Sequence, residues 1–323
     1  MANQVSVVIP TFNAGPGFED LLRKLGAQRG DFELEVVVVD SGSTDGTAEL
    51  AARHGALLHR VPKAGFNHGA TRDLGISFSS GEYVALTVQD AVPLDEEWLA
   101  PMVENLQKDP RVAAVYGRHV PRPDAGVMTR ALVGNLAVAG LERREQEIQD
   151  PAQYLSLPPA QRRRVVAFDN VSSCLRRSVW GRFPFGEADF AEDLRWGKKV
   201  VEAGYRIIYE PRSVVVHSHE RGVFYDLRRH YVDQLVLDEL FGARMVPNLP
   251  RLILSIPYAT RHVYGLLRRE EPAPSKKPKL LLDAATFALA SQVGAYLGAK
   301  VPSFSCLSPK LHAKLHRLLG KGV

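Results

Sequence analysis

The sequence predicts an α/β protein with a doubly wound parallel sheet, followed by a helical, basic C-terminal extension. Short β-branched runs alternate with helical patterns along the chain, beginning with VSVVIP (5–10), FEDLLRKLGAQ (18–28) and EVVVVD (35–40). This alternation is typical of β-α-β units, whose ligands bind at the carboxyl ends of the strands. The extension is predicted from charge, because residues 244–323 hold 13 Lys+Arg against 3 Asp+Glu.

The alternation continues beyond the second strand. Further helices are expected at 46–55, 68–79 and 95–109, and further strands at 56–62, 83–90 and 112–120. Asp40 and Asp90 both fall at the ends of expected strands. Because such ends meet at one edge of a parallel sheet, we expect the site there.

The middle of the chain departs from this pattern. The polar, arginine-rich residues 124–164 predict a mobile or helical insertion over the site. Strand patterns resume at Val165, a helix is expected at 191–204, and a strand pair is expected to end on two histidines, His217 and His219. We expect one domain over residues 1–240 and a helical extension over 241–323, which serves membrane association or oligomerisation.

Composition limits the class of protein. With 45% apolar and 24% charged residues, the 323-residue chain is globular. The N-terminus MANQVSVVIPTFN has no signal-peptide pattern, so a cytoplasmic protein is expected. Cys174 and Cys306 lack CxxC spacing, which argues against a disulfide framework or a thiolate zinc site.

The segment VVVVDSGSTDGT (36–47) indicates a nucleotide site. Asp40 can accept hydrogen bonds from a base or ribose, and the small polar residues offer backbone N–H groups at a helix start. The same segment is equally consistent with a strand end and a helix cap formed by Asp45 or Thr47. A Rossmann dehydrogenase is a poor alternative, because no GxGxxG follows the first strand.

Four blocks together resemble the family-2 glycosyltransferases, inverting enzymes of GT-A fold. These blocks are VVIPTFN with VVVDSGSTDGT, GFNHGATRDLG (65–75), GEYVALTVQDAVP (81–93) and FAEDLRWGKKVVEAGYRI (190–207). They occur in the family's order over about residues 4–220. The details FNHGATRDLG and QDAVP resemble the bacterial rhamnosyltransferase branch, which implies dTDP-L-rhamnose as donor. The same fold using a UDP- or GDP-sugar is the alternative, as is a non-catalytic glycan- or nucleotide-binding module.

The resemblance implies roles for individual residues. The implied nucleotide- and donor-binding residues are Pro10, Thr11, Asn13, Asp40, Ser43, Asn67, Arg72, Gln89 and Asp90. The family's D-x-D is here Val88-Gln89-Asp90, so one carboxylate remains to bind a divalent metal, Mg or Mn. His217 or His219 is the further metal ligand implied. Asp73 replaces the usual Asn after Arg72, and we expect these two to pair.

The reaction implied is displacement at the anomeric carbon by an acceptor hydroxyl, which needs a base. Asp193 matches the family's base, with Glu192 beside it. Taken alone, both acids also suit the first turn of a helix. Asp169, Asn170 and Trp196 are the implied acceptor-binding residues, although a turn and core packing would explain them equally.

The basic extension predicts an anionic partner. Leu280–Ala299 is long enough to span a bilayer, but Asp283 and Gln292 favour docking on the membrane surface. We therefore expect a peripheral location on the inner face of the cell membrane, near a glycan or lipid-linked acceptor of cell-envelope polysaccharide synthesis. Packing on the catalytic domain or a homodimer interface is the alternative. No nucleic-acid-binding motif is present.

Overall fold

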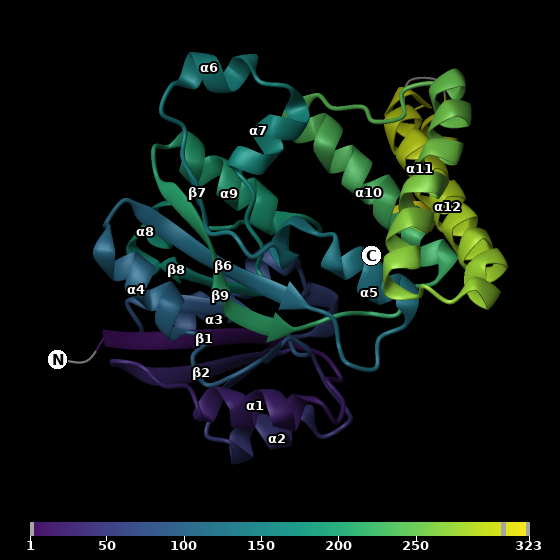
Figure 1. Ribbon diagram of the computed structural model, residues 1–323. Helices are drawn as coiled ribbons and strands as arrows, with labels where there is room; N and C mark the ends of the chain where they lie inside the picture. Colours follow the sequence, from purple (N-terminus) through teal and green to yellow (C-terminus); the bar gives the residue numbers. More distant parts are fainter. Residues whose placement is uncertain (1–2, 305–307, 321–323) are drawn as a thin grey trace. The chain divides into compact units, whose positions relative to one another are not determined.

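The computed structural model describes residues 3–304 and 308–320, and their strands form one mixed sheet. Figure 1 shows this sheet with helices on its faces. The strand order is β3-β2-β1-β4-β8-β6-β9-β5, and β7 also pairs with β9. The strands are β1 (Asn3–Thr11), β2 (Phe32–Asp40), β3 (Leu57–Arg60), β4 (Tyr83–Thr87), β5 (Val92–Pro93), β6 (Val112–Val120), β7 (Arg144–Gln146), β8 (Ser172–Arg176) and β9 (Arg206–Val216).

The sheet is parallel only in part. Strands β1 to β4 are parallel, as predicted, and β6 is parallel to β9. Strand β8 lies between β4 and β6 and is antiparallel to both. The parallel pairing expected from the β-α-β units holds for β1 to β4, whereas β8, which follows a long insertion rather than a β-α-β crossover, pairs in the antiparallel direction. The expected strand pair before the histidines is wrong, since β9 is one strand that bulges where residues 210 and 214 pair with β6.

Helices complete the first compact unit, which comprises residues 1–120 and 137–217. Helix α1 buries Phe18, Leu21, Leu22 and Leu25, whose spacing puts them on one face. This face joins the main core with valines of β1 and β2. The remaining helices of the unit are α2 (Thr47–Arg53), α3 (His68–Phe78), α4 (Ala100–Lys108), α6 (Pro151–Ser156), α7 (Pro159–Val165), α8 (Arg177–Arg182) and α9 (Glu192–Glu202), after α1 (Phe18–Gly26). The unit also contains the short 3-10 turns η1 (Lys63–Gly65) and η2 (Ala137–Ala139).

Helix α3 packs unusually close to its neighbours. A Cβ on Gly75 would lie 2.4 Å from a methyl group of Val8, and one on Gly69 would lie 2.0 Å from the carbonyl oxygen of Gly186. Both positions need glycine because of this approach. The backbone of α3 is thereby held against β1 and against the loop that precedes α9.

The second compact unit comprises residues 121–136 and 218–323, within the described ranges. It contains α5 (Val127–Gly134), α10 (Val223–Phe241), α11 (Leu249–Glu270), η3 (Pro274–Lys276), α12 (Lys277–Phe304) and α13 (Pro309–Gly320). The predicted helical character of the insertion is confirmed for α5, α6 and α7. The expected domain boundary at residue 240 stays a prediction; by its contacts α10 groups with the C-terminal helices.

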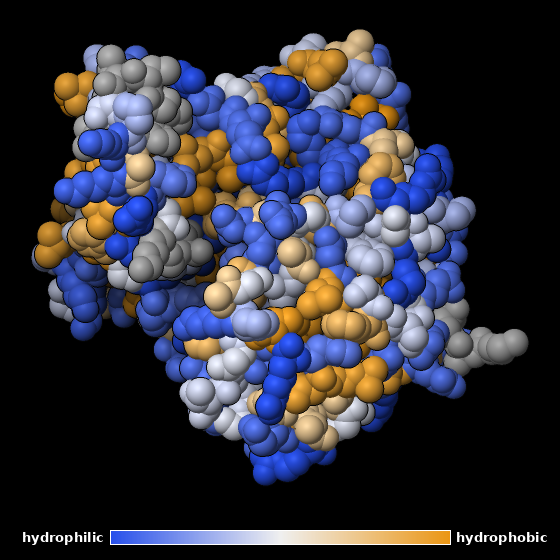
Figure 2. All heavy atoms as spheres, turned by 180° about the vertical axis from the view of Figure 1, so that it is seen from behind, coloured by the Kyte–Doolittle hydropathy of each residue, from blue (hydrophilic) through white to orange (hydrophobic). Residues whose placement is uncertain are grey.

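Helix α12 packs against α10 through small residues. A Cβ on Gly294 would lie 2.2 Å from the carbonyl oxygen of Leu227, and one on Gly298 would lie 2.6 Å from that of Tyr231. The helical stretch Pro274–Val301 is long and apolar enough to cross a membrane by length and composition. Its buried alanines and glycines equally suit the core helix of a helical unit, and the expected alternatives of packing on the catalytic domain or a homodimer interface stay predictions. Figure 2 shows a face of the molecule on which hydrophobic patches alternate with hydrophilic side chains.

Candidate active site

The loops after β1 and β2 interlock at the carboxyl ends of these strands. The carboxylate of Asp40 is buried and accepts hydrogen bonds from the hydroxyls of Thr11 and Ser43 and from the backbone N–H groups of Gly42 and Ser43. Asn13, in the left-handed conformation at φ 46°, donates its N–H to Ser43 Oγ and accepts from Thr44 N–H. Asp40 thus shapes this loop, and its direct contact with a nucleoside stays a prediction.

Gln89, the middle residue of the segment Val88-Gln89-Asp90 in which Val88 takes the place of the first acid, ties a third strand end to these loops. Its side-chain Oε1 accepts from Phe12 N–H at 2.8 Å, and its Nε2 donates to Phe12 O at 3.3 Å. A carboxylate could make only the first of these bonds, because it has no donor. Pro10 lies opposite Val39 in the β1–β2 pairing, on the strand that leads into this loop.

Asn67 connects α3 to the loop before α9. Its Oδ1 caps α3 by accepting from Ala70 N–H and also accepts from Ala188 N–H, while its Nδ2 donates to Asp189. An Asn at the N-cap is favoured because its side chain satisfies free N–H groups of the first turn. Asn67 therefore positions the backbone leading to α9.

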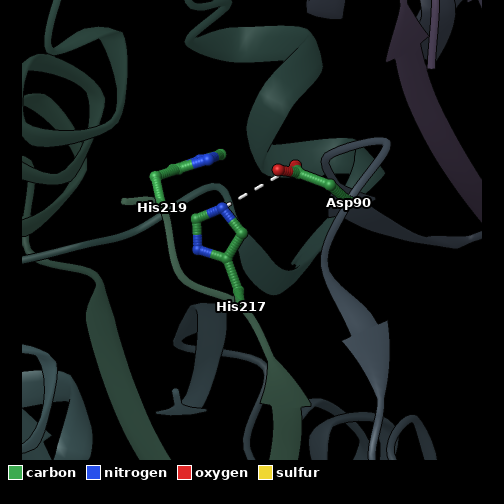
Figure 3. A group of neighbouring side chains, drawn as sticks. All are labelled: Asp90, His217 and His219. Carbon is green, nitrogen blue, oxygen red and sulfur yellow. Dashed lines mark ion pairs between the residues drawn. The ribbon is translucent and has the colours of Figure 1, made fainter. Parts of the chain in front are cut away.

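Asp90 and His217 form a candidate metal pair in the first unit. His217 Nε2 lies 3.7 Å from Asp90 Oδ1, and Figure 3 shows the two side chains facing each other. His219, two residues along the chain, belongs to the second unit, and its part in binding a metal stays a prediction. In an octahedral ion with bonds of about 2.1 Å, neighbouring ligands lie about 3 Å apart and opposite ones about 4.2 Å apart. The Asp90–His217 distance lies between these two values, so a side-chain movement of less than about 1 Å would bring the pair to either, and carboxylate with imidazole suits Mn²⁺. The sequence analysis expected His217 and His219 to lie at the end of a strand. This expectation is wrong, because β9 ends at Val216.

An acidic cluster forms where α9 begins. Arg72 Nη1 lies 2.9 Å from Glu192 Oε1, and both side chains are buried. Glu192 Oε1 also accepts from Asn170 Nδ2 at 3.2 Å. Ala191, immediately before the cluster, adopts the left-handed conformation at φ 56°, which costs a non-glycine residue about 1 kcal/mol. Such strain is typical of functional sites.

Asp193 lies beside this ion pair and has an unusual acidity. Burial, reinforced by the negative charges of Glu192 and Asp169, raises the pKa of Asp193 from 3.8 to about 8. The Leu194 N–H and the Arg72 guanidinium act in the opposite direction with less effect. Arg72 is already paired with Glu192, so the charge of its guanidinium group is largely neutralised there. Arg72 therefore lowers the pKa of Asp193 only slightly. Asp193 is thus a carboxyl group that gains or loses a proton near neutral pH.

His119, at the end of β6, is a site residue that the sequence analysis missed. Its buried Nε2 lies 3.7 Å from Asp169 Oδ1, and its ring meets that of His217 edge-on at 5.9 Å between centroids. His119 therefore connects the acidic cluster to the candidate metal pair. The sequence feature that could have identified His119 is its place in YGRHV, near the carboxyl end of an expected strand. Asp40 occupies the same kind of position.

Two expectations about neighbouring residues are corrected by the structure. Asp73 does not pair with Arg72; its carboxylate accepts from the Trp180 indole and from the N–H groups of Phe185 and Gly186. Successive residues on a helix point in directions about 100° apart, which separates the two side chains.

Trp196, an implied acceptor-binding residue, is only 1% exposed and packs against Phe168 and Phe185. Its indole N–H donates to Phe183 O. The side chain has no exposed face to offer a sugar in this structure, because Trp196 lies on the buried side of α9. Of the two cysteines, Cys174 is a buried free thiol and Cys306 lies outside the described residues.

Three buried polar atoms around the acidic cluster have no hydrogen-bond partner among the described residues. They are Arg72 Nε, Asn170 Oδ1 and His119 Nε2. Buried polar atoms in folded proteins are nearly always satisfied, so a group of three marks a place that a polar ligand or water would complete. A sugar hydroxyl both donates and accepts hydrogen bonds, so one donor, one acceptor and one imidazole nitrogen suit such a ligand.

Comparison with known proteins identifies the family. The model of the family described as Glycosyl transferase family 2 matches residues 6–169. O-antigen chain rhamnosyltransferase RfbN of Salmonella typhimurium is 28% identical over 234 residues, 71% of this chain and 70% of that protein. O-antigen chain rhamnosyltransferase WbaN of Salmonella anatum is 27% identical over 231 residues, 70% of each.

Solved structures agree on the fold. S. aureus TarS 1–349 in complex with UDP aligns over 91% of each chain, with 16% identity and a TM-score of 0.52. This likeness, with the family match, confirms the predicted GT-A fold with its C-terminal helical region. Since the family model matches just over half of the 323 residues, the chain belongs to glycosyl transferase family 2.

Proposed function

We propose that this glycosyltransferase moves L-rhamnose from dTDP-L-rhamnose to a hydroxyl group of a glycan or lipid-linked acceptor, in cell-envelope polysaccharide synthesis. The family membership and the two O-antigen rhamnosyltransferases among its relatives support this proposal. The observation that carries it is the Asp193 carboxyl group, held beside the Arg72–Glu192 pair with a pKa of about 8.

Asp193 has the property that a general base for a sugar hydroxyl needs. In its ionised form a carboxylate accepts the hydroxyl proton as the oxygen attacks the anomeric carbon and the bond to the donor diphosphate breaks. A raised pKa makes that carboxylate a stronger base than an ordinary aspartate. Arg72 and Asn170 hold Glu192 in place beside it, and Asp169 adds negative charge that favours proton uptake.

Asp90 and His217 are the residues that would hold a divalent metal, with His219 as a further candidate. Such an ion neutralises the diphosphate as it leaves. Gln89, which precedes Asp90 in the chain, contributes by fixing the loop of Phe12 through two hydrogen bonds.

Nucleotide selectivity provides the test. We would measure the thermal stabilisation of the full chain by dTDP, UDP, GDP and NAD, each with and without Mn²⁺, and then the release of dTDP from dTDP-L-rhamnose. The expected result is the largest shift with dTDP plus Mn²⁺. A larger shift with UDP or GDP would replace the rhamnosyl donor by the alternative sugar nucleotide. A shift with every nucleotide and no turnover with any sugar donor would favour a non-catalytic binding module.

A further inference from the structure

Helix α11 in the second unit presents a row of exposed apolar side chains. Ile253 is 62% exposed, Leu254 is 67% exposed and Tyr258 is 76% exposed. The other side of the helix is buried through Leu252, Val263 and Leu267. Large apolar side chains on one side of a helix whose other side is already packed mark a surface that another apolar body covers.

A groove extends this surface to the start of α12. It has a volume of about 580 Å³ and is lined by Ile256, Pro257, Thr260, Arg261, Tyr264 and Leu281. Leu281 and Leu282 are both exposed at this end of α12. We call the side chains of Ile253, Leu254, Tyr258 and Leu281 the α11 face.

Basic side chains surround the α11 face. A second groove, of about 330 Å³, lies further along α11 and is lined by Asn135, Tyr258, Arg261, His262, Gly265, Leu266 and Arg269. Neither Arg261 nor Arg269 forms an ion pair with any described residue. Exposed cations also flank the helix ends, at Arg251 and at Lys276, Lys277 and Lys279. Arg261 lines both grooves, so apolar and cationic surfaces meet at this residue.

We propose that the α11 face docks on the surface of a bilayer that contains anionic lipids. Apolar side chains enter the region between head groups and acyl chains, while the surrounding arginines and lysines contact lipid phosphates. This occupant is favoured by charge, since residues 244–323 have a net charge of +10 from 13 basic and 3 acidic residues. The proposal goes beyond glycosyl transfer and does not depend on which donor the enzyme uses.

Charge and packing argue against the other occupants. A second copy of the chain would bring two strongly cationic surfaces together, which opposes association. A nucleic acid would leave Ile253 and Leu254 without an apolar partner. A spanning arrangement of α12 would remove Gly294 and Gly298 from their close packing against α10. Surface docking leaves every helix contact of the second unit intact.

The test is sedimentation of the full-length chain with vesicles of phosphatidylcholine, with and without phosphatidylglycerol, at low and high salt. The expected result is binding to the anionic vesicles that weakens as salt rises, and little binding to phosphatidylcholine alone. Arg261→Ala with Arg269→Ala should lower the partition coefficient about 30-fold, at about fivefold per cation, and reduce the salt dependence. Ile253→Glu with Leu254→Glu should lower it by at least tenfold.

Matched controls separate docking from general effects. Leu141→Glu with Leu155→Glu places the same two negative charges at exposed leucines outside the α11 face, and Arg163→Ala with Arg164→Ala removes the same two positive charges from exposed positions of α7. Both controls should bind vesicles as the unchanged chain does, and all variants should keep its melting temperature and its turnover with soluble acceptor. The proposal is overturned if the docking variants bind like the controls, or if phosphatidylcholine alone binds equally well. It is also overturned if Ile253→Glu with Leu254→Glu dissolves a dimer without changing vesicle binding.

Discussion

Replacing Asp193 by asparagine should abolish transfer and stabilise the folded chain. Asparagine has nearly the same shape but accepts no proton at neutral pH, so a loss of about 100- to 10,000-fold in kcat is expected from the missing base. Binding of dTDP should be unchanged, because the base acts on the acceptor. Release of dTDP with acceptor present measures the first effect, and nucleotide titration the second.

The stabilising effect follows from the sign of the pKa shift. Because the pKa of Asp193 is about 8 in the folded chain and 3.8 ordinarily, the folded state binds more protons between these values. The free energy of unfolding contributed by this residue therefore falls as pH rises through that window and levels off above about 8. One pH unit corresponds to about 1.4 kcal/mol, so the full interval sets an upper bound of about 5–6 kcal/mol.

Since Asp193 shares this effect with Glu192 and Asp169, we expect about 2–3 kcal/mol of added stability for Asp193→Asn at about pH 9, and little at about pH 4. Urea unfolding at both pH values measures it. Glu187→Gln is the matched control, because it neutralises an exposed carboxylate in the loop before α9. Retained turnover would refute the assignment of the base, and a loss of stability at high pH would refute the account of its burial.

Three further outcomes are expected. His217→Ala should remove the extra stabilisation that Mn²⁺ gives with dTDP while leaving that by dTDP alone, as thermal unfolding would show; an unchanged Mn²⁺ effect would contradict the metal assignment. Asp169→Asn removes a negative charge beside the proposed base, so the rise of kcat/KM with pH should move lower by about half to one pH unit, and a shift to higher pH would contradict it. Gly69→Ala should destabilise the chain by about 1–3 kcal/mol, because the new Cβ meets Gly186 O at 2.0 Å, whereas Gly26→Ala, which meets nothing within 4 Å, should not; urea unfolding that ranks them equally would contradict the packing argument.

The sequence predicts the N-terminal half of the fold well because the signal there is local. Each β-α-β unit shows in the sequence as a β-branched run, a helical pattern and a polar residue at the strand end. The short connections between these elements predict parallel pairing. The antiparallel β8 could not be predicted in this way, since its place between β4 and β6 depends on residues far along the chain. The same holds for His119, whose importance comes from contacts with Asp169 and His217.

Polar residues of the candidate site also divide into two kinds that a sequence does not distinguish. Asp40 and Gln89 meet their hydrogen-bonding needs inside the protein, so their first role is to fix the loops that a donor would contact. Arg72, Asn170 and His119 each keep a buried polar atom that forms no hydrogen bond with the described residues, in the neighbourhood of a carboxyl group that holds its proton near neutral pH. Residues of the first kind tolerate only substitutions that keep their hydrogen bonds. Substitutions of the second kind of residue should instead change substrate binding or turnover, because folding alone gives no reason to leave those atoms without a hydrogen bond.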